Sequence, residues 1–201
     1  IGAGLPVLDA TGSMIVDIGG GTSEVAVISL GDIVTSKSVR VAGDTFDEAI
    51  ISYVKRTFNL LIGERSAEDI KLKLGSAYPY EGEAAMEIKG RNLVDGLPKN
   101  IEVSAADVRE AIYDQLYLIV DTIRSTFEKT PPELAADIFD FGIVMVGGGA
   151  LLPGMDQVIH AQTGIRVMIA KKPMECVCTG LGRMLQSTGG DFSEFVRYKV
   201  K

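Results

Sequence analysis

The chain has 201 residues and a net charge of −7, from 27 acidic and 20 basic residues. That balance argues against a sequence-independent nucleic-acid binder, which needs a basic surface, so nucleic acid is not an expected partner. The 46% of hydrophobic residues suffices for a buried core, and no apolar run approaches the roughly 18 residues of a transmembrane helix.

The first apolar run predicts a strand over residues 13–18, and two more strands are expected over 24–30 and 33–41. Turns at Gly19–Gly21 and Leu30–Asp32 would join them into an antiparallel meander. A P-loop or a dinucleotide fingerprint would require a helix after the first triple glycine. Neither motif is therefore expected here.

A helix is predicted over residues 44–59, with Asp44 as its N-cap, because apolar residues recur on one face at helical spacing. A second helix is predicted over residues 67–74, with Ser66 as its cap and Asp69 as a capping-box-like partner. Two short strand-like pieces follow, over residues 85–89 and 101–103.

A long amphipathic helix is predicted from a cap at Ser104 to about Lys129. Its apolar stripe is expected to lie in the core, and Pro131 and Pro132 would end it. The stripe consists of Val108, Ile112, Leu116, Ile119, Ile123 and Phe127.

The last third alternates helices with strands, and the strands are predicted over 143–146 and 165–170. The helices would end at Phe139, at Thr163 and at about Ser187. A meander followed by helix, strand, helix, strand and helix is typical of an α/β fold, with a mixed sheet layered with helices.

Two cysteines, Cys176 and Cys178, are separated by one residue, so a bridge between them would close a strained ring. We expect buried free thiols in a reducing cytoplasm.

The first glycine turn consists of Gly19, Gly20 and Gly21. N–H groups from Gly19 to Ser23 can converge on an anion as a nest does, and Thr22 and Ser23 add hydroxyl donors. Asp17 shares a face with Gly19 by strand alternation. Its carboxylate would repel a phosphate unless a cation lay between them, which implies hydrated Mg²⁺. The alternative is a tight hairpin that Asp17 merely caps.

The second glycine turn, Gly147, Gly148 and Gly149, follows another apolar strand. Its surface without side chains could accept an adenine or a ribose, and the alternative is close packing of strand on helix. Glu68 and Lys71 lie on one helix face and could bind ribose hydroxyls and the edge of a base. Their alternative is a surface ion pair.

Together these motifs resemble the superfamily of actin, heat-shock chaperone and sugar-kinase ATPases, and most closely the MreB family of bacterial actins. Val16–Val27 resembles the second phosphate motif, Met145–Asp156 the adenosine motif, and Ala67–Lys71 the ribose-side helix. The resemblance covers the chain to about residue 187. It implies the second half of an actin-like (ribonuclease H-like) fold, and the start at Ile1 favours a fragment of a longer protein.

The resemblance also implies ATP or ADP with Mg²⁺ as ligands. Asp17 would organise the hydrated metal, and Gly19, Gly20, Gly21, Thr22 and Ser23 would form the phosphate site. The ribose and adenine would be held by Glu68, Asp69, Ile70 and Lys71. Adenosine would be lined by Gly147, Gly148, Gly149, Ala150 and Leu151.

The same resemblance implies a division of the chain. Residues 1–12 would hold the end of a linker helix and a connection, and residues 188–201 a tail. Residues 13–42 and 108–187 would form the larger subdomain, with 43–107 inserted as a smaller one.

For the whole protein the resemblance implies ATP-dependent filaments in the cytoplasm, under the membrane, that guide wall growth and rod shape. Partners would be other copies and membrane-bound elongation and wall-synthesis proteins, with membrane contact through the other half. That half would also carry the opposing phosphate loop and the acidic residue that positions water, so this chain alone is expected to be inactive. The alternatives are a heat-shock-chaperone-like or other actin-fold ATPase, and a non-filamentous scaffold.

Overall fold

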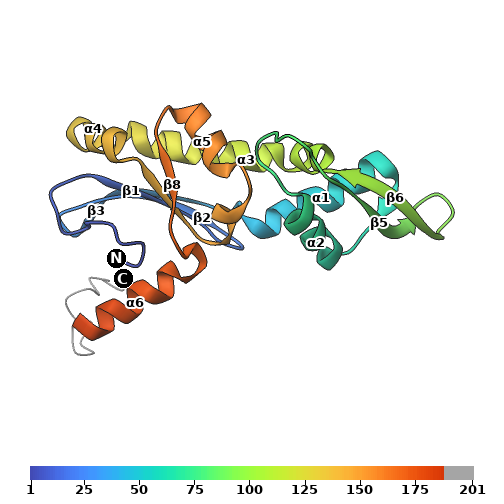
Figure 1. Ribbon diagram of the computed structural model, residues 1–201, viewed down its shortest axis with the longest axis horizontal. Coiled ribbons are helices and arrows are strands. Elements are labelled where there is room, and N and C mark those ends of the chain that lie inside the picture. The colour runs from blue at the N-terminus through green and yellow to red at the C-terminus, as the bar shows by residue number, and fades with distance from the viewer. Residues whose placement is uncertain (188–201) are drawn as a thin grey trace, which may run out of the picture.

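A computed structural model of the chain describes residues 1–187 as a mixed α/β structure with two sheets (Figure 1). The larger sheet has the strand order β3-β2-β1-β7-β8. Its first three strands form the predicted antiparallel meander, while β7 lies parallel to β1 and β8 parallel to β7. These strands are β1 (Ser13–Ile18), β2 (Ser23–Ser29), β3 (Asp32–Val39), β7 (Ile143–Val146) and β8 (Val167–Ile169).

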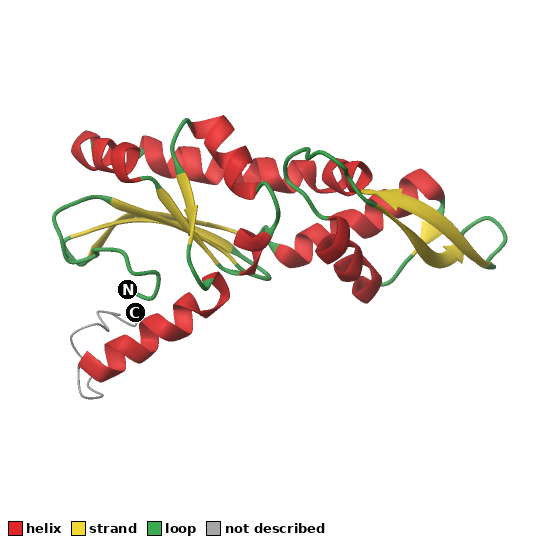
Figure 2. Cartoon of the chain, viewed as in Figure 1, coloured by secondary structure: helices red, strands yellow, loops and turns green. Residues whose placement is uncertain are grey.

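The core of the larger sheet lies on the face covered by helix α3 (Ala105–Glu128) (Figure 2). Met14, Val16 and Ile18 alternate toward that face and are fully buried. The predicted stripe of α3 is confirmed, with Ile112, Ile119 and Ile123 at 0% exposure and Phe127 partly buried. Ser104 caps α3 as predicted, because its Oγ accepts the N–H of Asp107 at 3.2 Å.

Two other helices begin at residues that the sequence did not indicate. Helix α1 (Gly43–Phe58) has Ala42 as its N-cap, so the prediction of Asp44 as cap is wrong. The Thr45 hydroxyl instead accepts from the Ala42 N–H at 2.9 Å. Helix α2 (Glu64–Leu74) begins three residues before the predicted start. Ser66 therefore lies inside the first turn, and its predicted capping role is wrong.

The smaller sheet contains β4 (Leu60–Leu61), β5 (Ala85–Asn92) and β6 (Pro98–Ser104), all antiparallel. It lies with α1 and α2 at the end of the molecule remote from α4 (Figure 1). Helix α3 contacts α1, α2 and β6 as well as β2 and β3, and so connects the two sheets. The predicted boundary at residue 107 falls inside α3, and the division into two subdomains stays a prediction.

The remaining elements are α4 (Pro132–Phe141), the 3₁₀ turn η1 (Gly148–Leu151), α5 (Met155–Thr163), the 3₁₀ turn η2 (Pro173–Glu175) and α6 (Cys176–Ser187). Residues 1–12 form turns rather than the end of a helix, and Gly4 has a φ of +79°, outside the helical region. Among residues 1–187, no helix is both long and apolar enough to cross a bilayer. The predicted tail, 188–201, lies outside the described residues.

Both cysteines are free, but Cys178 is exposed on α6 and only Cys176 is buried. The prediction of two buried thiols is therefore wrong for Cys178. Two positions apart on a helix, the side chains point about 200° apart around the axis, so one faces the sheet and the other faces outward.

Candidate functional site

The two glycine turns converge on one cleft of about 410 Å³, between the end of the larger sheet and the helices α1 and α2. The first turn contributes Gly19 and Gly20, and the second contributes Gly148, Gly149 and Leu151. Segments that are 130 residues apart in sequence therefore form one cavity.

The first turn is held against the start of α1. Gly43 N–H donates to the Gly19 carbonyl at 3.1 Å, and Asp44 N–H donates to the Gly20 carbonyl at 2.8 Å. These bonds engage the carbonyls of Gly19 and Gly20, whereas the N–H groups of Gly20, Gly21 and Thr22 have no hydrogen-bond partner in residues 1–187. A row of free amides at a tight turn is an anion-binding arrangement.

The hydroxyl expected from Ser23 is not available to a ligand. Ser23 is 0% exposed, and its Oγ donates to the Val41 carbonyl at 2.6 Å. The prediction of a free hydroxyl donor at Ser23 is therefore wrong, because this hydroxyl connects β2 to the segment before α1. Thr22 remains exposed at the tip of the turn.

Asp17 lies in β1 between Glu24 of β2 and Val146 of β7, and its carboxylate is beside the second glycine turn, since a Cβ on Gly147 would overlap Asp17 Oδ1. Burial, and then the neighbouring charge of Glu24, raise the pKa of the Asp17 carboxyl. Two carboxylates side by side destabilise each other unless a cation is present. The surroundings of Asp17 therefore suit an acidic group that operates beside a metal ion.

At the second turn, the glycines differ in what surrounds them. Gly147 has a φ of +82°, and a Cβ there would overlap the carbonyl oxygen of Ile18. A Cβ on Gly149 would lie 2.7 Å from the Cβ of Ile18, so these two glycines serve close packing. Gly148 has nothing within 4 Å of its Cβ position and provides the open surface.

The second turn continues directly into the four-residue η1, and the next helix, α5, begins at Met155 and ends at Thr163, the predicted end. Leu151 is 54% exposed and lines the cleft. Ala150 is fully buried, so its side chain does not face a ligand.

Helix α2 supplies one wall of the cleft through Glu68 and Lys71. Lys71 Nζ lies 2.7 Å from Asp47 Oδ2 and donates to the Gly43 carbonyl at 2.9 Å. The other two predicted residues do not face the cleft. Asp69 pairs with Lys73 at 2.7 Å on an exposed face, and Ile70 is 1% exposed in the core.

Two acidic residues of the site, Asp44 and Asp47, were not predicted as site residues. Both line the cleft from the first two turns of α1. The sequence does contain a pattern that could have indicated them. Two carboxylates one helical turn apart follow Gly43, and an α-helix places residues i and i+3 on one side.

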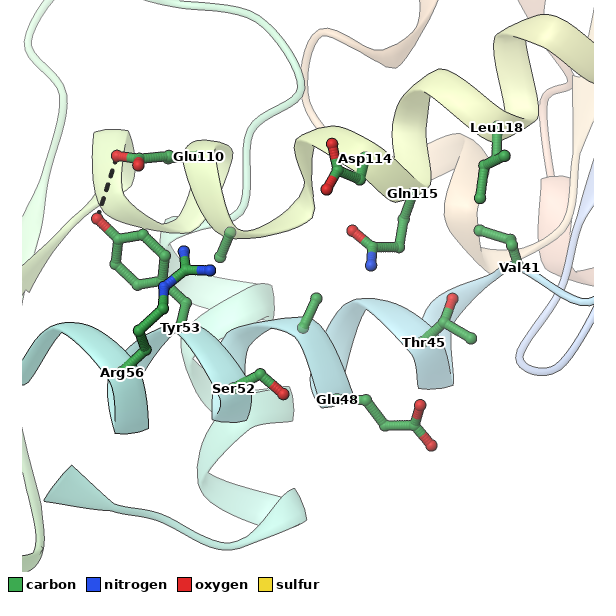
Figure 3. Close-up of a pocket in the computed structure, with 12 residues that line it drawn as sticks. Val41, Thr45, Glu48, Ser52, Tyr53, Arg56, Glu110, Asp114, Gln115 and Leu118 are labelled. Carbon is green, nitrogen blue, oxygen red and sulfur yellow. Dashed lines mark hydrogen bonds between the residues drawn. The ribbon is translucent and has the colours of Figure 1, made fainter. Parts of the chain in front are cut away.

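A second groove of about 390 Å³ lies between α1 and α3 (Figure 3). There the Tyr53 hydroxyl donates to Asp107 Oδ1 at 3.0 Å and to Glu110 Oε2 at 3.2 Å. Burial first, and then these bonds, raise the pKa of Tyr53 to about 12. The Arg56 guanidinium lies 5.7 Å from the centre of the Tyr53 ring. Neither glycine turn lines this groove, and its contacts join the two helices.

Comparison with known proteins agrees with this geometry. The family model described as MreB/Mbl protein matches residues 1–190. The cell shape-determining protein Mbl of Bacillus subtilis is 48% identical over 187 residues, which are 93% of this chain and 56% of that protein. The cell shape-determining protein MreB of Escherichia coli is 51% identical, over 96% of this chain and 57% of that protein. The chain thus spans little more than half the length of these curated relatives.

Solved structures give the same result. MreB5 of Spiroplasma citri bound to ADP superposes with a TM-score of 0.91 at 39% identity, over 96% of this chain and 58% of that one. The same protein bound to AMPPNP also gives 0.91, at 37% identity. A double helical filament of MamK gives 0.76 at 22% identity, which shows an actin-like fold alone.

Proposed function

The chain belongs to the MreB/Mbl family, and on that basis we propose that the whole protein binds ATP in the described cleft and assembles into filaments of the bacterial cytoskeleton. One observation is the main support for a nucleotide site in this cleft. The first glycine turn, which has three unpaired amides, and the second, which has a bare surface at Gly148, both line one cavity. The MreB5 structures bound to ADP and AMPPNP support the same assignment.

Within the site, each glycine turn would receive a different part of the nucleotide. The N–H groups of Gly20, Gly21 and Thr22 would bind phosphate oxygens, and Gly148 would face the adenosine. Asp17 would hold the waters of a bound Mg²⁺, whose charge would offset that of the phosphates and of Glu24. The raised pKa of Asp17 fits this role, since a cation removes the repulsion that burial intensifies.

Hydrolysis would depend on residues beyond this chain. A water must be held in line with the terminal phosphate, and by family resemblance the acidic residue that does so belongs to the other half. Residues 1–201 would therefore supply one wall of the site, and turnover would belong to the whole protein.

In the cell the filaments would lie in the cytoplasm under the membrane, guide wall synthesis and maintain a rod shape. The relatives are named for determining cell shape, and MamK of the same fold forms a filament. Self-association is thus the first proposed interaction. Contacts with membrane-bound elongation and wall-synthesis proteins, and membrane contact through the other half, are further proposals.

Light scattering and negative-stain electron microscopy of the full-length protein test this proposal. Filaments should form with ATP and Mg²⁺ and should fail to form with EDTA or without nucleotide. A Gly20→Val variant, with a branched side chain among the phosphate-binding amides, should lose ATP binding and filaments together. Nucleotide-independent assembly at wild-type level in that variant would contradict the proposal.

A further inference from the structure

The cleft assigned to a nucleotide is lined by more negative than positive side chains. Among the described residues 1–187, its charged lining consists of three carboxylates and one ammonium, those of Asp44, Asp47, Glu68 and Lys71. The ammonium is engaged, because Lys71 Nζ lies 2.7 Å from Asp47 Oδ2. Phosphates in this cleft would therefore meet two carboxylates that have no ion-pair partner in this part of the chain. Like charges that share a site destabilise each other.

The carboxylate of Asp44 lies beside the first glycine turn, where the phosphates would bind. A Cβ on Gly20 would stand 3.6 Å from Asp44 Oδ1, and a Cβ on Gly21 would stand 3.8 Å from Asp44 Oδ2. The start of α1 holds the residue there, since the Asp44 N–H donates to the Gly20 carbonyl at 2.8 Å. Asp44 is exposed, and its carboxylate accepts no hydrogen bond within residues 1–187. Its negative charge is therefore uncompensated by the described part of the chain.

A phosphate bound to the free amides of this turn would feel the charge of Asp44. The amide nitrogen of Gly20 lies about 2.5 Å from the Cβ position, and a bound oxygen would lie about 2.9 Å from that nitrogen. Together with the 3.6 Å to Asp44 Oδ1, these lengths keep the bound oxygen within roughly 9 Å of the carboxylate. At that distance, repulsion between two unit charges weakens binding roughly 2- to 20-fold, for effective dielectric constants between about 80 and 20.

We propose that Asp44 makes phosphate binding at the first glycine turn depend on a divalent cation, so that the cleft selects the Mg²⁺ complex of a nucleotide over the free nucleotide. The inference rests on the proposed nucleotide site and adds a second acidic residue to Asp17. Without the ion, the Asp44 carboxylate repels the phosphates. With the ion bound, the carboxylate and the phosphates are both attracted to it, directly or through its waters.

The position of Asp44 in its helix offers a different explanation for an acidic residue at this point. Asp44 lies in the first turn of α1, where a carboxylate stabilises a helix through its interaction with the helix dipole. That role affects folding and predicts no dependence of nucleotide affinity on the metal. The two explanations therefore differ in a quantity that can be measured.

Calorimetric titration of the full-length protein with ADP, once with Mg²⁺ and once with EDTA, tests the proposal. Wild type should bind ADP more weakly in EDTA. Asp44→Asn should bind ADP in EDTA roughly 2- to 20-fold more tightly than wild type does, and its ratio of affinities with and without Mg²⁺ should fall by at least that factor. Asp44→Ser, a second neutral variant that suits a helix start, should behave in the same way. Asp44→Glu, which keeps the charge, should keep the wild-type ratio.

Glu48→Gln is the matched control, because it removes one charge from the same helix at a residue that lines the groove between α1 and α3 rather than the cleft (Figure 3). It should leave the ratio unchanged. Adenosine, which carries no phosphate, should bind wild type and Asp44→Asn equally in both buffers. A wild-type ratio in the two neutral variants, an equal change in Glu48→Gln, or an altered affinity for adenosine overturns the inference. Failure of wild type to bind ADP even with Mg²⁺ would instead refute the proposed nucleotide site.

Discussion

Gly149 lies against Ile18 so closely that no side chain fits between them. A Cβ on Gly149 would stand 2.7 Å from the Cβ of Ile18 and would overlap its Cγ2. The contact joins the ends of the neighbouring parallel strands β1 and β7, which carry the two glycine turns. The contact between Gly149 and Ile18 therefore sets the distance between the two glycine turns.

Gly149→Ala should destabilise the fold, whereas Gly148→Ala should not. Overpacking at Gly149 is expected to lower the free energy of unfolding by about 1–3 kcal/mol. Gly148→Ala should remain within about 0.5 kcal/mol of wild type, because its Cβ position is open. Urea unfolding followed by circular dichroism measures both. Equal stability of the two variants would contradict the packing described here.

Replacement of Asp17 should remove ATP hydrolysis without unfolding the protein. Asp17→Ala in the full-length protein should abolish hydrolysis with the fold intact, since the metal would lose its organising carboxylate. Phosphate release and circular dichroism on the same sample measure the two effects. Wild-type turnover in this variant would show that the metal role belongs to another residue.

Burial and the charge of Glu24 raise the folded-state pKa of Asp17 above its unfolded value. The contribution of Asp17 to stability is then fully present below the unfolded pKa and is lost as pH rises through the folded pKa. At pH 7 without nucleotide, Asp17→Asn should therefore melt at the wild-type temperature or roughly 1–3 °C above it. A clear loss of thermal stability would contradict this sign.

The cap of α3 should be sensitive to acid. Burial acts to raise the pKa of Asp107, but hydrogen bonds from Ser104 and Tyr53 outweigh it, and the pKa lies below its usual value. Its stabilisation is present above the unfolded pKa of about 3.9 and is lost as pH falls through the folded pKa.

Asp107→Asn should thus cost about 1 kcal/mol at pH 7, and the difference from wild type should shrink as the pH falls below the unfolded pKa of about 3.9. Ser104→Ala should cost a similar amount at pH 7. Urea titrations at pH 7 and below that pKa measure these differences. A penalty for Asp107→Asn that is independent of pH would mean that the carboxylate charge is not what stabilises the cap.

Much of the fold could be predicted because its signals are local. The stripe of α3 from Val108 to Phe127 repeats at helical spacing, and the strands of the meander are bounded by glycine turns. The starts of α1 and α2 could not be predicted in the same way. Asp44 and Ser66 are common cap residues, yet Ala42 and Gly63 take those positions. Tertiary hydrogen bonds such as Gly43 N–H to the Gly19 carbonyl decide the starting point.

The parts of the candidate site that are formed by backbone could be predicted from the sequence. The glycine turns reveal themselves in sequence, since only glycine permits such close approach at Gly147 and Gly149. Side chains were harder to assign, because a helix has several faces and the sequence does not say which one meets the cleft. Ile70 and Asp69 face away from it, whereas Asp47 enters it through its pairing with a residue on another helix.

Residues 1–201 should fold as a separate chain, because α3 packs on both sheets and a continuous core runs through them. Thermal unfolding monitored by circular dichroism should give one cooperative transition. A broad, non-cooperative loss of signal would contradict this expectation.

The same separate chain should bind ATP weakly, with adenine preferred over guanine, and should release phosphate at the background rate. It has both glycine turns and the α2 wall, but these form one side of an open cleft. A ligand held on one side stays hydrated, so each charged contact is screened. Calorimetric titration against the full-length protein measures the difference in affinity. Tight binding by residues 1–201, or steady phosphate release after purification, would show that the opposing phosphate loop and the water-positioning residue are not needed.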